Sequence, residues 1–340
     1  MQTRFNVCDL NAIETRVGAW LAGCDSLLNV FQPFTDDTGH YYPNGRDPYL
    51  DFAGKMYGIP YAKLWADYKG FNGEAAQLEA KKKRQAAKPG VLGAIYRLGG
   101  GAWAVNESGD RVRTGLWGYA WNMGIEMEQE QSNFVVRMFR EAYTEICSTD
   151  MDGNTPIGIW KRLEFATTDV IKGQDTKRHV GPNGCVLIDK LNVAGRPGAL
   201  MRMQLPSGRR LHYLDARIEM TKMPWEDKET GEPMYRDALC YNGQNQKTGQ
   251  WSKITTHGGK LFENLVQAIA RDVLAEKMLL IEEADMPCVG HVHDECISLV
   301  PDDPFSPEVE DMVEIMSRPI SWAPGLLLGA DGFMDAYYHK

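Results

Sequence analysis

Acidic residues stand at the ends of two short apolar segments that lie far apart in the chain. Asp9 follows the apolar segment that includes Val7, and Asp294 and Glu295 precede the apolar run Cys296–Val300. Carboxylates without a basic neighbour suit a hard divalent cation such as Mg²⁺. If the two strand ends fold side by side, Asp9 and Asp294 could hold two such ions ~3.5–4 Å apart, an arrangement that activates a hydroxyl for attack on a phosphate.

Two other readings of this acidic segment stay open from the residues alone. An isolated Asp–Glu pair is most often part of a solvated turn. His291 and His293 alternate correctly for two zinc ligands on one strand, but zinc needs a second cluster of ligands. The remaining histidines are isolated from one another: His40, His179, His212, His257 and His339.

A second group of residues with chemical potential lies between residues 74 and 98, an Ala- and Lys-rich stretch that predicts a helix. Arg84, Lys88, Leu92 and Tyr96 follow one another in steps of four and therefore share a helix face. Two cations followed by an apolar and an aromatic side chain suit a triphosphate with its sugar and base. A Lys-rich helix is otherwise usually a solvated one, and the neighbouring residues 81–83 fit that description.

The stretch 258–284 predicts the longest helix, with Leu261, Leu265, Ile269 and Val273 on one face. A narrow polar stripe runs along the same helix and contains Lys260, Asn264, Gln267 and Arg271. The stripe alone indicates a solvated face.

The remaining pattern predicts a mixed chain of helices and strands. We expect one or two helices over 12–30, a helix over 127–147, a strand–turn–strand unit over 199–214 and two short strands over 288–300. Residues 153–256 otherwise look irregular. The class is therefore α+β or mixed α/β.

Composition restricts the class of protein. The 340 residues are 43% hydrophobic, which is enough for a sizeable core, and the net charge of −9 by itself counts against a nucleic-acid partner. Seven scattered cysteines without a CxxC pair predict reduced thiols. No apolar run approaches the ~18–20 residues that cross a membrane, and no signal peptide is evident, so we expect a soluble cytoplasmic protein without a membrane partner.

Three segments together resemble the motifs of family A DNA polymerases. "DLNAIETRV" is similar to their motif A, "RQAAKPGVLGAIY" to motif B and "VHDE" to motif C, and the three occur in the family order. "LPSGRRLHY", "GGKLFENLVQAIARDVLAEKM" and the "YYHK" ending resemble the phage and prophage branch, which implies a bacterial host cell. The resemblance extends from Asp9 to the C-terminus.

The resemblance implies a fold, a reaction and partners. It implies an α+β fold with palm segments at 1–30 and 257–340, and largely helical fingers with a branch-specific insertion at 31–256. The implied reaction is template-directed DNA synthesis, in which a primer 3′-hydroxyl attacks a deoxynucleoside triphosphate with the help of two Mg²⁺ ions. Primer–template DNA and deoxynucleotides are the implied partners.

Site roles follow from the matched motif positions. Asp9 and Asp294 match the metal-binding catalytic carboxylates, and Glu295 matches an auxiliary acid. Arg84, Lys88, Leu92 and Tyr96 match the nucleotide-binding face of motif B. Glu14 matches the steric gate against a ribose 2′-hydroxyl. The implied primer–template contacts are Gln267, His293, Asn264, Arg271 and Lys260.

The chain departs from the family pattern at several positions. Tyr49 stands where many members have a phosphate-contacting histidine, and Arg97 replaces a glycine after the motif B tyrosine. Pro89 lies inside motif B, where we expect the helix to kink or restart.

Motif A begins eight residues after Met1, so we expect the exonuclease and thumb domains to be absent, either because they form a separate N-terminal half, as in a split polymerase, or because they were removed or lost. The alternatives are an inactive nucleic-acid-binding remnant, or another two-metal phosphotransferase or nuclease.

Overall fold

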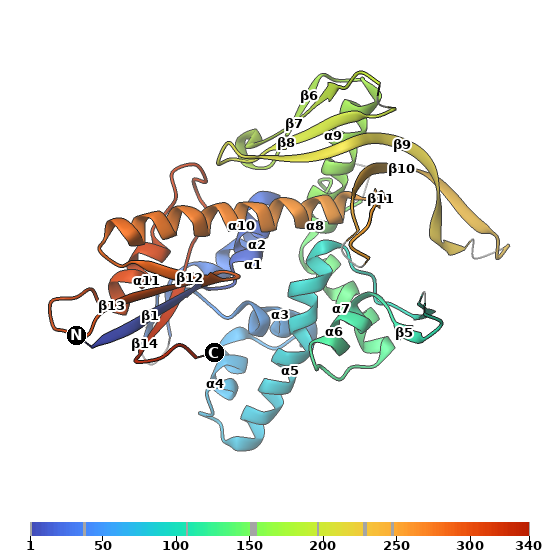
Figure 1. Cartoon of the computed structure of the whole chain (residues 1–340). Coiled ribbons are helices and arrows are strands. Elements are labelled where there is room, and N and C mark those ends of the chain that lie inside the picture. The colour runs from blue at the N-terminus through green and yellow to red at the C-terminus, as the bar shows by residue number, and fades with distance from the viewer. Residues whose placement is uncertain are drawn as a thin grey trace. The chain divides into compact units, whose positions relative to one another are not determined.

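The fold is known from a computed structural model (Figure 1) that describes residues 2–36, 39–106, 108–149, 155–195, 197–226, 230–245 and 248–339. The chain forms two compact units. Unit 1 comprises Met1–Tyr143 and Val266–Lys340, and unit 2 comprises Thr144–Leu265. The helix α10 (Gly258–Glu283) begins in unit 2 and continues into unit 1.

Unit 1 contains a four-stranded antiparallel sheet in the order β12–β13–β1–β14. Its strands are β1 (Thr3–Leu10), β12 (Cys288–Val292), β13 (Glu295–Pro301) and β14 (Ala330–Asp335). The helix α11 (Val309–Ser317) packs on β1 and β14. A Cβ added at Gly332 would come within 2.7 Å of Val309, so glycine is needed for this close approach.

The rest of unit 1 is mainly helical. A bundle forms around α5 (Glu74–Gly93), which packs against α3, α4, α6 and α7. Its helices and the short elements are α1 (Ile13–Ala22), α2 (Asp25–Leu28), η1 (Asn29–Phe31), α3 (Pro48–Tyr57), α4 (Tyr61–Tyr68), η2 (Ala94–Tyr96), α6 (Gly115–Asn122), α7 (Gln129–Ala142), and the hairpins β2 (Phe34–Thr35) with β3 (Tyr41–Tyr42) and β4 (Trp103–Val105) with β5 (Arg111–Arg113).

The helix α5 continues through Pro89, so the prediction that it restarts there is wrong. Proline removes one backbone hydrogen bond, but close packing holds this turn in place. A Cβ at Gly90 would come within 2.6 Å of Phe52 and 2.7 Å of Val135. Tertiary contact at this buried turn therefore outweighs the local preference.

Unit 2 is built on a six-stranded antiparallel sheet in the order β11–β10–β9–β8–β7–β6, so the expectation of an irregular region over 153–256 is wrong. Its strands are β6 (Lys177–Val180), β7 (Val186–Asn192), β8 (Ala199–Gln204), β9 (Arg210–Glu226), β10 (Pro233–Gln244) and β11 (Trp251–Thr256). The helices are α8 (Thr144–Cys147) and α9 (Ile159–Lys172), with a 3₁₀ turn η3 (Pro182–Gly184).

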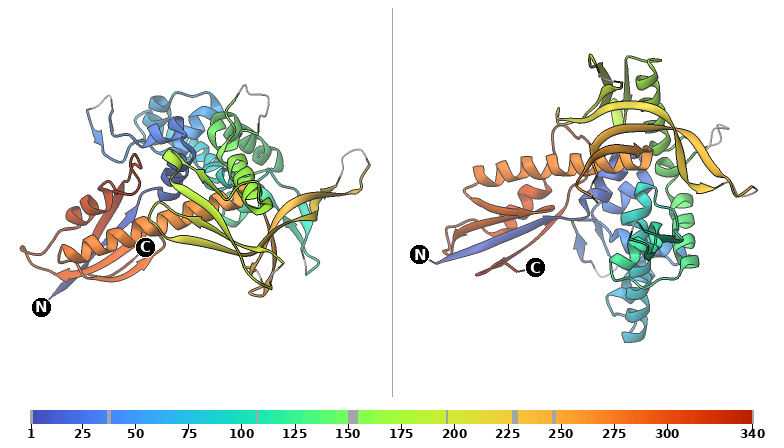
Figure 2. Two further views of the ribbon diagram at one scale, coloured as in Figure 1. Left: turned by 90° about the horizontal axis from the view of Figure 1, so that it is seen from above. Right: turned by 45° about the vertical axis from the view of Figure 1, so that its right-hand side comes forward.

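The alternation on β8 is regular: Met201 and Met203 are buried, while Arg202 and Gln204 are half-buried. On the outer strands, charged residues interrupt this alternation, so these strands could not be predicted from the sequence alone. Figure 2 shows β9 and β10 as a long curved ribbon.

The other structural predictions agree with the fold. The chain mixes helices with antiparallel strands, as the α+β class requires, and the helices over 12–30, 127–147 and 258–284 are confirmed. The four residues expected on the apolar face of α10 are fully buried: Leu261, Leu265, Ile269 and Val273. None of the seven cysteines forms a disulfide, which agrees with the prediction of reduced thiols.

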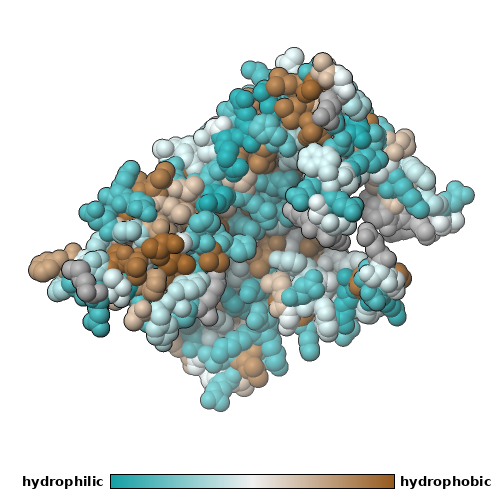
Figure 3. Space-filling view, in the orientation of Figure 1, coloured by the Kyte–Doolittle hydropathy of each residue, from teal (hydrophilic) through white to brown (hydrophobic). Residues whose placement is uncertain are grey.

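The surface seen in Figure 3 intersperses hydrophilic and hydrophobic residues. Within the described part of the chain, no helix combines the length and apolar character needed to span a bilayer.

Lys277 on α10 is a fully buried cation whose Nζ donates to the carbonyl of Arg318 at 2.6 Å. Burial lowers the pKa of Lys277 from 10.5 to about 8. Between these two values the unfolded chain binds more protons than the native chain, so this lysine makes the free energy of unfolding rise with pH.

We therefore expect Lys277→Met to remove a pH-dependent increment of up to about 3 kcal/mol between pH 8 and 10.5. Urea unfolding of wild type and variant at a series of pH values measures it, because other titrating groups cancel in the difference. A difference between the two proteins that stays constant from pH 7 to pH 10 would contradict the account.

Candidate active site

The register of β1 brings three carboxylates into one row of the sheet in unit 1. Asp9 lies opposite Glu295 on β13 and opposite Asp331 on β14. Residues directly opposite one another on antiparallel strands point to the same face of the sheet, with Cβ atoms about 5 Å apart. Asp9 is exposed, whereas Glu295 is buried at 5% relative exposure.

Asp294 reaches the same end of the sheet through the turn between β12 and β13. Its carbonyl accepts a hydrogen bond from the backbone N–H of Leu10 at 3.1 Å. The preceding residue, His293, has a φ of 58°, a left-handed conformation that few non-glycine residues adopt. The sharp turn holds Asp294 beside the end of β1, so residues separated by 285 positions in sequence become neighbours.

The chain reverses just after Asp9 in a second turn with a left-handed residue, Ala12, at φ 48°. The buried guanidinium of Arg16 holds this turn. Its Nε donates to the carbonyl of Asn11 at 2.7 Å, and its Nη2 donates to the carbonyl of Asn44 at 2.8 Å. Burial lowers the pKa of Arg16 to about 10, and the charge of Asp331 partly offsets that effect.

Asp331 is a site residue that sequence reasoning missed. Its carboxylate accepts from Asn11 Nδ2 at 2.9 Å and from Asn44 Nδ2 at 3.0 Å. It follows the apolar run Leu326–Leu328 much as Asp9 follows its own apolar segment, so a signal was present in the sequence.

Glu295 is held from the C-terminal tail. The hydroxyl of Tyr338 donates to Glu295 Oε1 at 2.8 Å, and this contact raises the pKa of Tyr338. Lys340, the last residue of the "YYHK" ending, lies outside the described residues.

The nearby carboxylates contribute to a raised pKa of the Cys8 thiol. Burial is the main cause that raises its pKa to about 12, and Asp9, Asp331 and Glu295 raise it further. Negative charge is therefore concentrated at this end of the sheet, which is the environment that a divalent cation would neutralise.

A second part of unit 1 joins motif A to motif B. The hydroxyl of Tyr96, in η2, donates to Glu14 Oε2 on α1 at 2.8 Å. Tyr96 is buried at 9% relative exposure. Two residues to which the resemblance assigns nucleotide contacts, 82 positions apart, thus touch directly.

The cations of α5 surround Tyr49 on α3. The guanidinium carbon of Arg84 lies 4.9 Å from the centre of the Tyr49 ring, and Lys88 Nζ lies 5.8 Å from it. Arg84 also pairs with Asp47 at 2.8 Å. Burial is the main cause that raises the pKa of Tyr49 to about 12, so its hydroxyl is neutral at physiological pH. The expected face of α5 therefore carries both cations next to an aromatic ring, and Leu92 lies half-buried further along the same helix.

The polar stripe on α10 has mixed surroundings. Gln267 and Arg271 are exposed, and both lie in the part of the helix that belongs to unit 1. Asn264 donates to the hydroxyl of Tyr213 at 3.1 Å, and Lys260 pairs with Glu263 at 2.9 Å, both within unit 2. His293 is exposed in its turn.

The predicted Mg²⁺ site requires no more than a pair of carboxylates from the protein. Across the residues that the structure describes, no group of three or more His, Cys, Asp or Glu side chains is arranged to hold a metal ion. Mg²⁺, however, is commonly bound through one or two carboxylates together with substrate phosphates. Asp9, at the end of β1, and Asp294, in the turn before β13, supply such a pair, and these are the residues to which the motif resemblance assigns this role.

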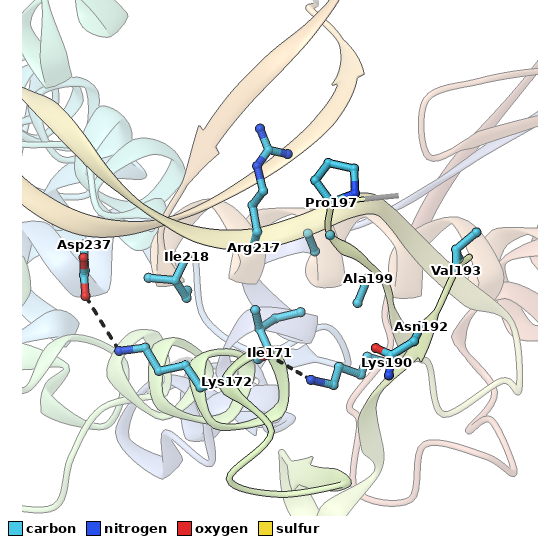
Figure 4. Close-up of a pocket in the computed structure, with 12 residues that line it drawn as sticks. Ile171, Lys172, Lys190, Asn192, Val193, Pro197, Ala199, Arg217, Ile218 and Asp237 are labelled. Atoms are coloured by element: carbon cyan, nitrogen blue, oxygen red, sulfur yellow. Dashed lines mark hydrogen bonds and ion pairs between the residues drawn. The ribbon is translucent and has the colours of Figure 1, made fainter. Parts of the chain in front are cut away.

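A hollow of about 520 Å³ in unit 2 offers a less suitable site (Figure 4). It is lined from α9, β7, β8, β9 and β10. All three of its cations are already engaged: Lys172 lies 3.7 Å from Asp237, Lys190 Nζ donates to the carbonyl of Ile171 at 2.9 Å, and Arg217 Nε donates to Glu219 Oε1 at 2.6 Å. We therefore place the chemistry at the end of β1.

Comparison with known proteins supports the resemblance seen in the motifs. No family model matches the chain. The chain is 32% identical over 336 residues to a DNA polymerase of Bacillus phage SP02, an alignment that covers 99% of this chain and 41% of that polymerase. The resemblance to a phage DNA polymerase is thereby confirmed.

Among solved structures, the polymerase domain of Pol1 from M. smegmatis, in complex with DNA primer–template and dNTP, matches with a TM-score of 0.48. The match has 13% identity and covers 98% of this chain and 40% of that chain. The chain thus spans less than half the length of either protein.

Proposed function

We propose that this chain carries the nucleotidyl-transfer site of a DNA-directed DNA polymerase. One observation supports this most directly: Asp9 and Asp294 meet at the end of one sheet, in a chain similar along nearly its whole length to a phage DNA polymerase. In this proposal, residues 1–30 and 257–340 form the palm, and the helices around α5 belong to the fingers.

In the proposed chemistry, each carboxylate at the end of β1 and β13 has a role. Asp9 and Asp294 would hold two Mg²⁺ ions, which supply charge neutralisation at the phosphate and lower the pKa of a primer hydroxyl. Glu295, fixed by Tyr338, keeps negative charge next to this pair. Most of the rate enhancement in such a reaction comes from positioning and charge stabilisation, which the fixed register of β1 supports.

The nucleotide would lie along α5. Arg84 and Lys88 would bind its phosphates, with the ring of Tyr49 ordering both cations. The Glu14–Tyr96 hydrogen bond would hold the Glu14 side chain where a ribose 2′-hydroxyl would otherwise lie. Leu92 and Tyr96 would contact the sugar and base. Gln267, Arg271 and His293 are the proposed primer–template contacts in unit 1, and Lys260 and Asn264 those in unit 2.

We also propose that full activity needs polymerase parts that this sequence does not contain. The alignment leaves more than half of the phage polymerase unmatched. The missing parts would supply further backbone contacts, and those contacts provide much of the affinity of proteins for DNA.

Primer extension on a primed template with Mg²⁺ and four deoxynucleotides tests the proposal. The chain is assayed alone and with a polypeptide that supplies the unmatched polymerase part. We expect incorporation in at least one setting, and a loss of about 10³-fold or more in Asp9→Asn and Asp294→Asn, because charge stabilisation at the phosphate is lost. Asp302→Asn, an exposed acid that directly follows β13, is the control. Wild type that binds DNA but incorporates nothing in either setting would instead identify a DNA-binding remnant.

The role of the α5 cations is tested by Lys88→Ala. Loss of a charge-assisted phosphate contact of about 1.5–3 kcal/mol should raise the KM for deoxynucleotide about 10-fold or more, with a smaller effect on kcat. Lys82→Ala is the matched control, because Lys82 lies on the same helix and pairs with Glu79 in solvent. Equal KM values for the two variants would contradict the assignment of Lys88 to the nucleotide-binding site.

A further inference from the structure

The two units differ in charge. Unit 2 contains 17 Lys and Arg against 15 Asp and Glu, whereas the whole chain has 37 against 46. The segment 144–265 is therefore slightly basic within an acidic protein. Distribution decides what such a charge can bind, so the relevant question is where its cations lie.

The strands β6 to β9 of unit 2 separate their cations onto two faces. Arg178 pairs with Asp169 on α9 at 2.6 Å, and Lys190 donates to the carbonyl of Ile171 at the end of α9. These contacts identify the face that α9 covers. The same face carries the buried residues Val180, Val186, Ile188, Met201, Met203 and Tyr213.

Because side chains alternate along a strand, the neighbouring residues point away from α9. Two cross-strand rows form this outer face. One row is Lys177, Asp189, Arg202 and His212, and the next is His179, Leu187, Gln204 and Arg210. Lys177, His179, His212 and Arg210 are exposed.

The outer face carries a net positive charge. Asp189 is the one carboxylate in the two rows, and Arg202 neutralises it through two hydrogen bonds of 2.7 and 2.6 Å. Arg210 donates to the neutral side chain of Gln204, so that contact leaves its charge uncompensated. Lys177 and Arg210 are thus the cations available for an anionic partner.

We propose that this outer face of β6–β9 binds the sugar–phosphate backbone of duplex DNA. The proposal rests on the proposed function, which assigns no task to the strands β6–β9. Strands lie about 4.8 Å apart and successive rows about 6.8 Å apart, so Lys177 on β6 and Arg210, three strands and one row away on β9, are separated by about 16 Å. That distance is comparable with the major groove, which is about 12 Å wide, so the two cations can reach phosphates on both of its sides.

The composition of the face favours duplex over single-stranded DNA. Proteins that bind single strands usually stack the bases on aromatic side chains, and these two rows contain no Phe, Tyr or Trp. Lys and Arg on a sheet face suit contacts to phosphates that do not depend on base sequence.

The test measures the salt dependence of binding to a fluorescently labelled primer–template duplex by the full chain. Each phosphate contact contributes about 0.9 to the slope of log K against log salt. We expect the double variant Lys177→Ala/Arg210→Ala to lower the magnitude of that slope by about 2 between roughly 50 and 200 mM NaCl. Arg178→Ala, on the same strand but facing α9, should leave the slope unchanged.

Unchanged slope in the double variant, with its thermal unfolding intact, would overturn the proposal. A reduced slope with single-stranded DNA alone would overturn the duplex assignment, as would an equal change in Arg178→Ala.

The salt slope tests this face independently of the proposed polymerase activity. Asp9→Asn should lose nucleotide incorporation and keep the wild-type slope of log K against log salt. Wild type that extends primers while the double variant keeps its slope refutes this face alone. A reduced slope in the double variant of a chain that extends no primer refutes the polymerase proposal alone.

Discussion

The pairing of β1 with β13 and β14 is the constraint on which the candidate site depends. Side chains on a strand alternate between faces, so a slip of one residue would carry Asp9 to the opposite face and remove it from the row that it shares with Glu295. The core fixes the register. Cys8 and Leu10 on β1 and Cys296 on β13 are buried on the face opposite Asp9, and the same slip would carry Cys8 and Leu10 to the face that now carries Asp9. Folding energy and site geometry are thus determined by one set of pairings.

Buried polar contacts then fix the groups that project from this sheet and its neighbours. Arg16 holds the turn after Asp9, Tyr338 holds Glu295, and Tyr96 holds Glu14. Each contact joins residues from different elements, so an error in one element would leave a buried polar group without its partner. Such groups cost about 1–3 kcal/mol each, which favours a single arrangement of the site.

Most residues of the candidate site could be proposed from the sequence, because they stand at boundaries of strong local patterns. Asp9 and Asp294 follow or precede apolar strands, and the steps of four on α5 require no tertiary information. Asp331 also follows an apolar run, but its position next to Asp9 arises from the register of β14 against β1, which the local pattern does not encode. The sheet of unit 2 was also missed, because charged and polar residues interrupt the apolar pattern of a strand such as β10, where Arg236 and Asp237 are adjacent. Its regularity comes from pairing with β9 and β11, and pairing between distant strands cannot be read from composition.

The account centres on Asp9 and Asp294 acting together as ligands of a divalent cation. Binding of Mn²⁺, which prefers the same oxygen ligands, tests this directly and independently of any polymerase part outside this sequence. A titration followed by electron paramagnetic resonance would compare wild type, Asp9→Asn, Asp294→Asn and the exposed control Asp302→Asn, each with a deoxynucleoside triphosphate present. The account predicts that both site variants lose, relative to wild type and the control, the bound ions that the protein adds to those held by the nucleotide alone. Equal Mn²⁺ binding by all four proteins would contradict it.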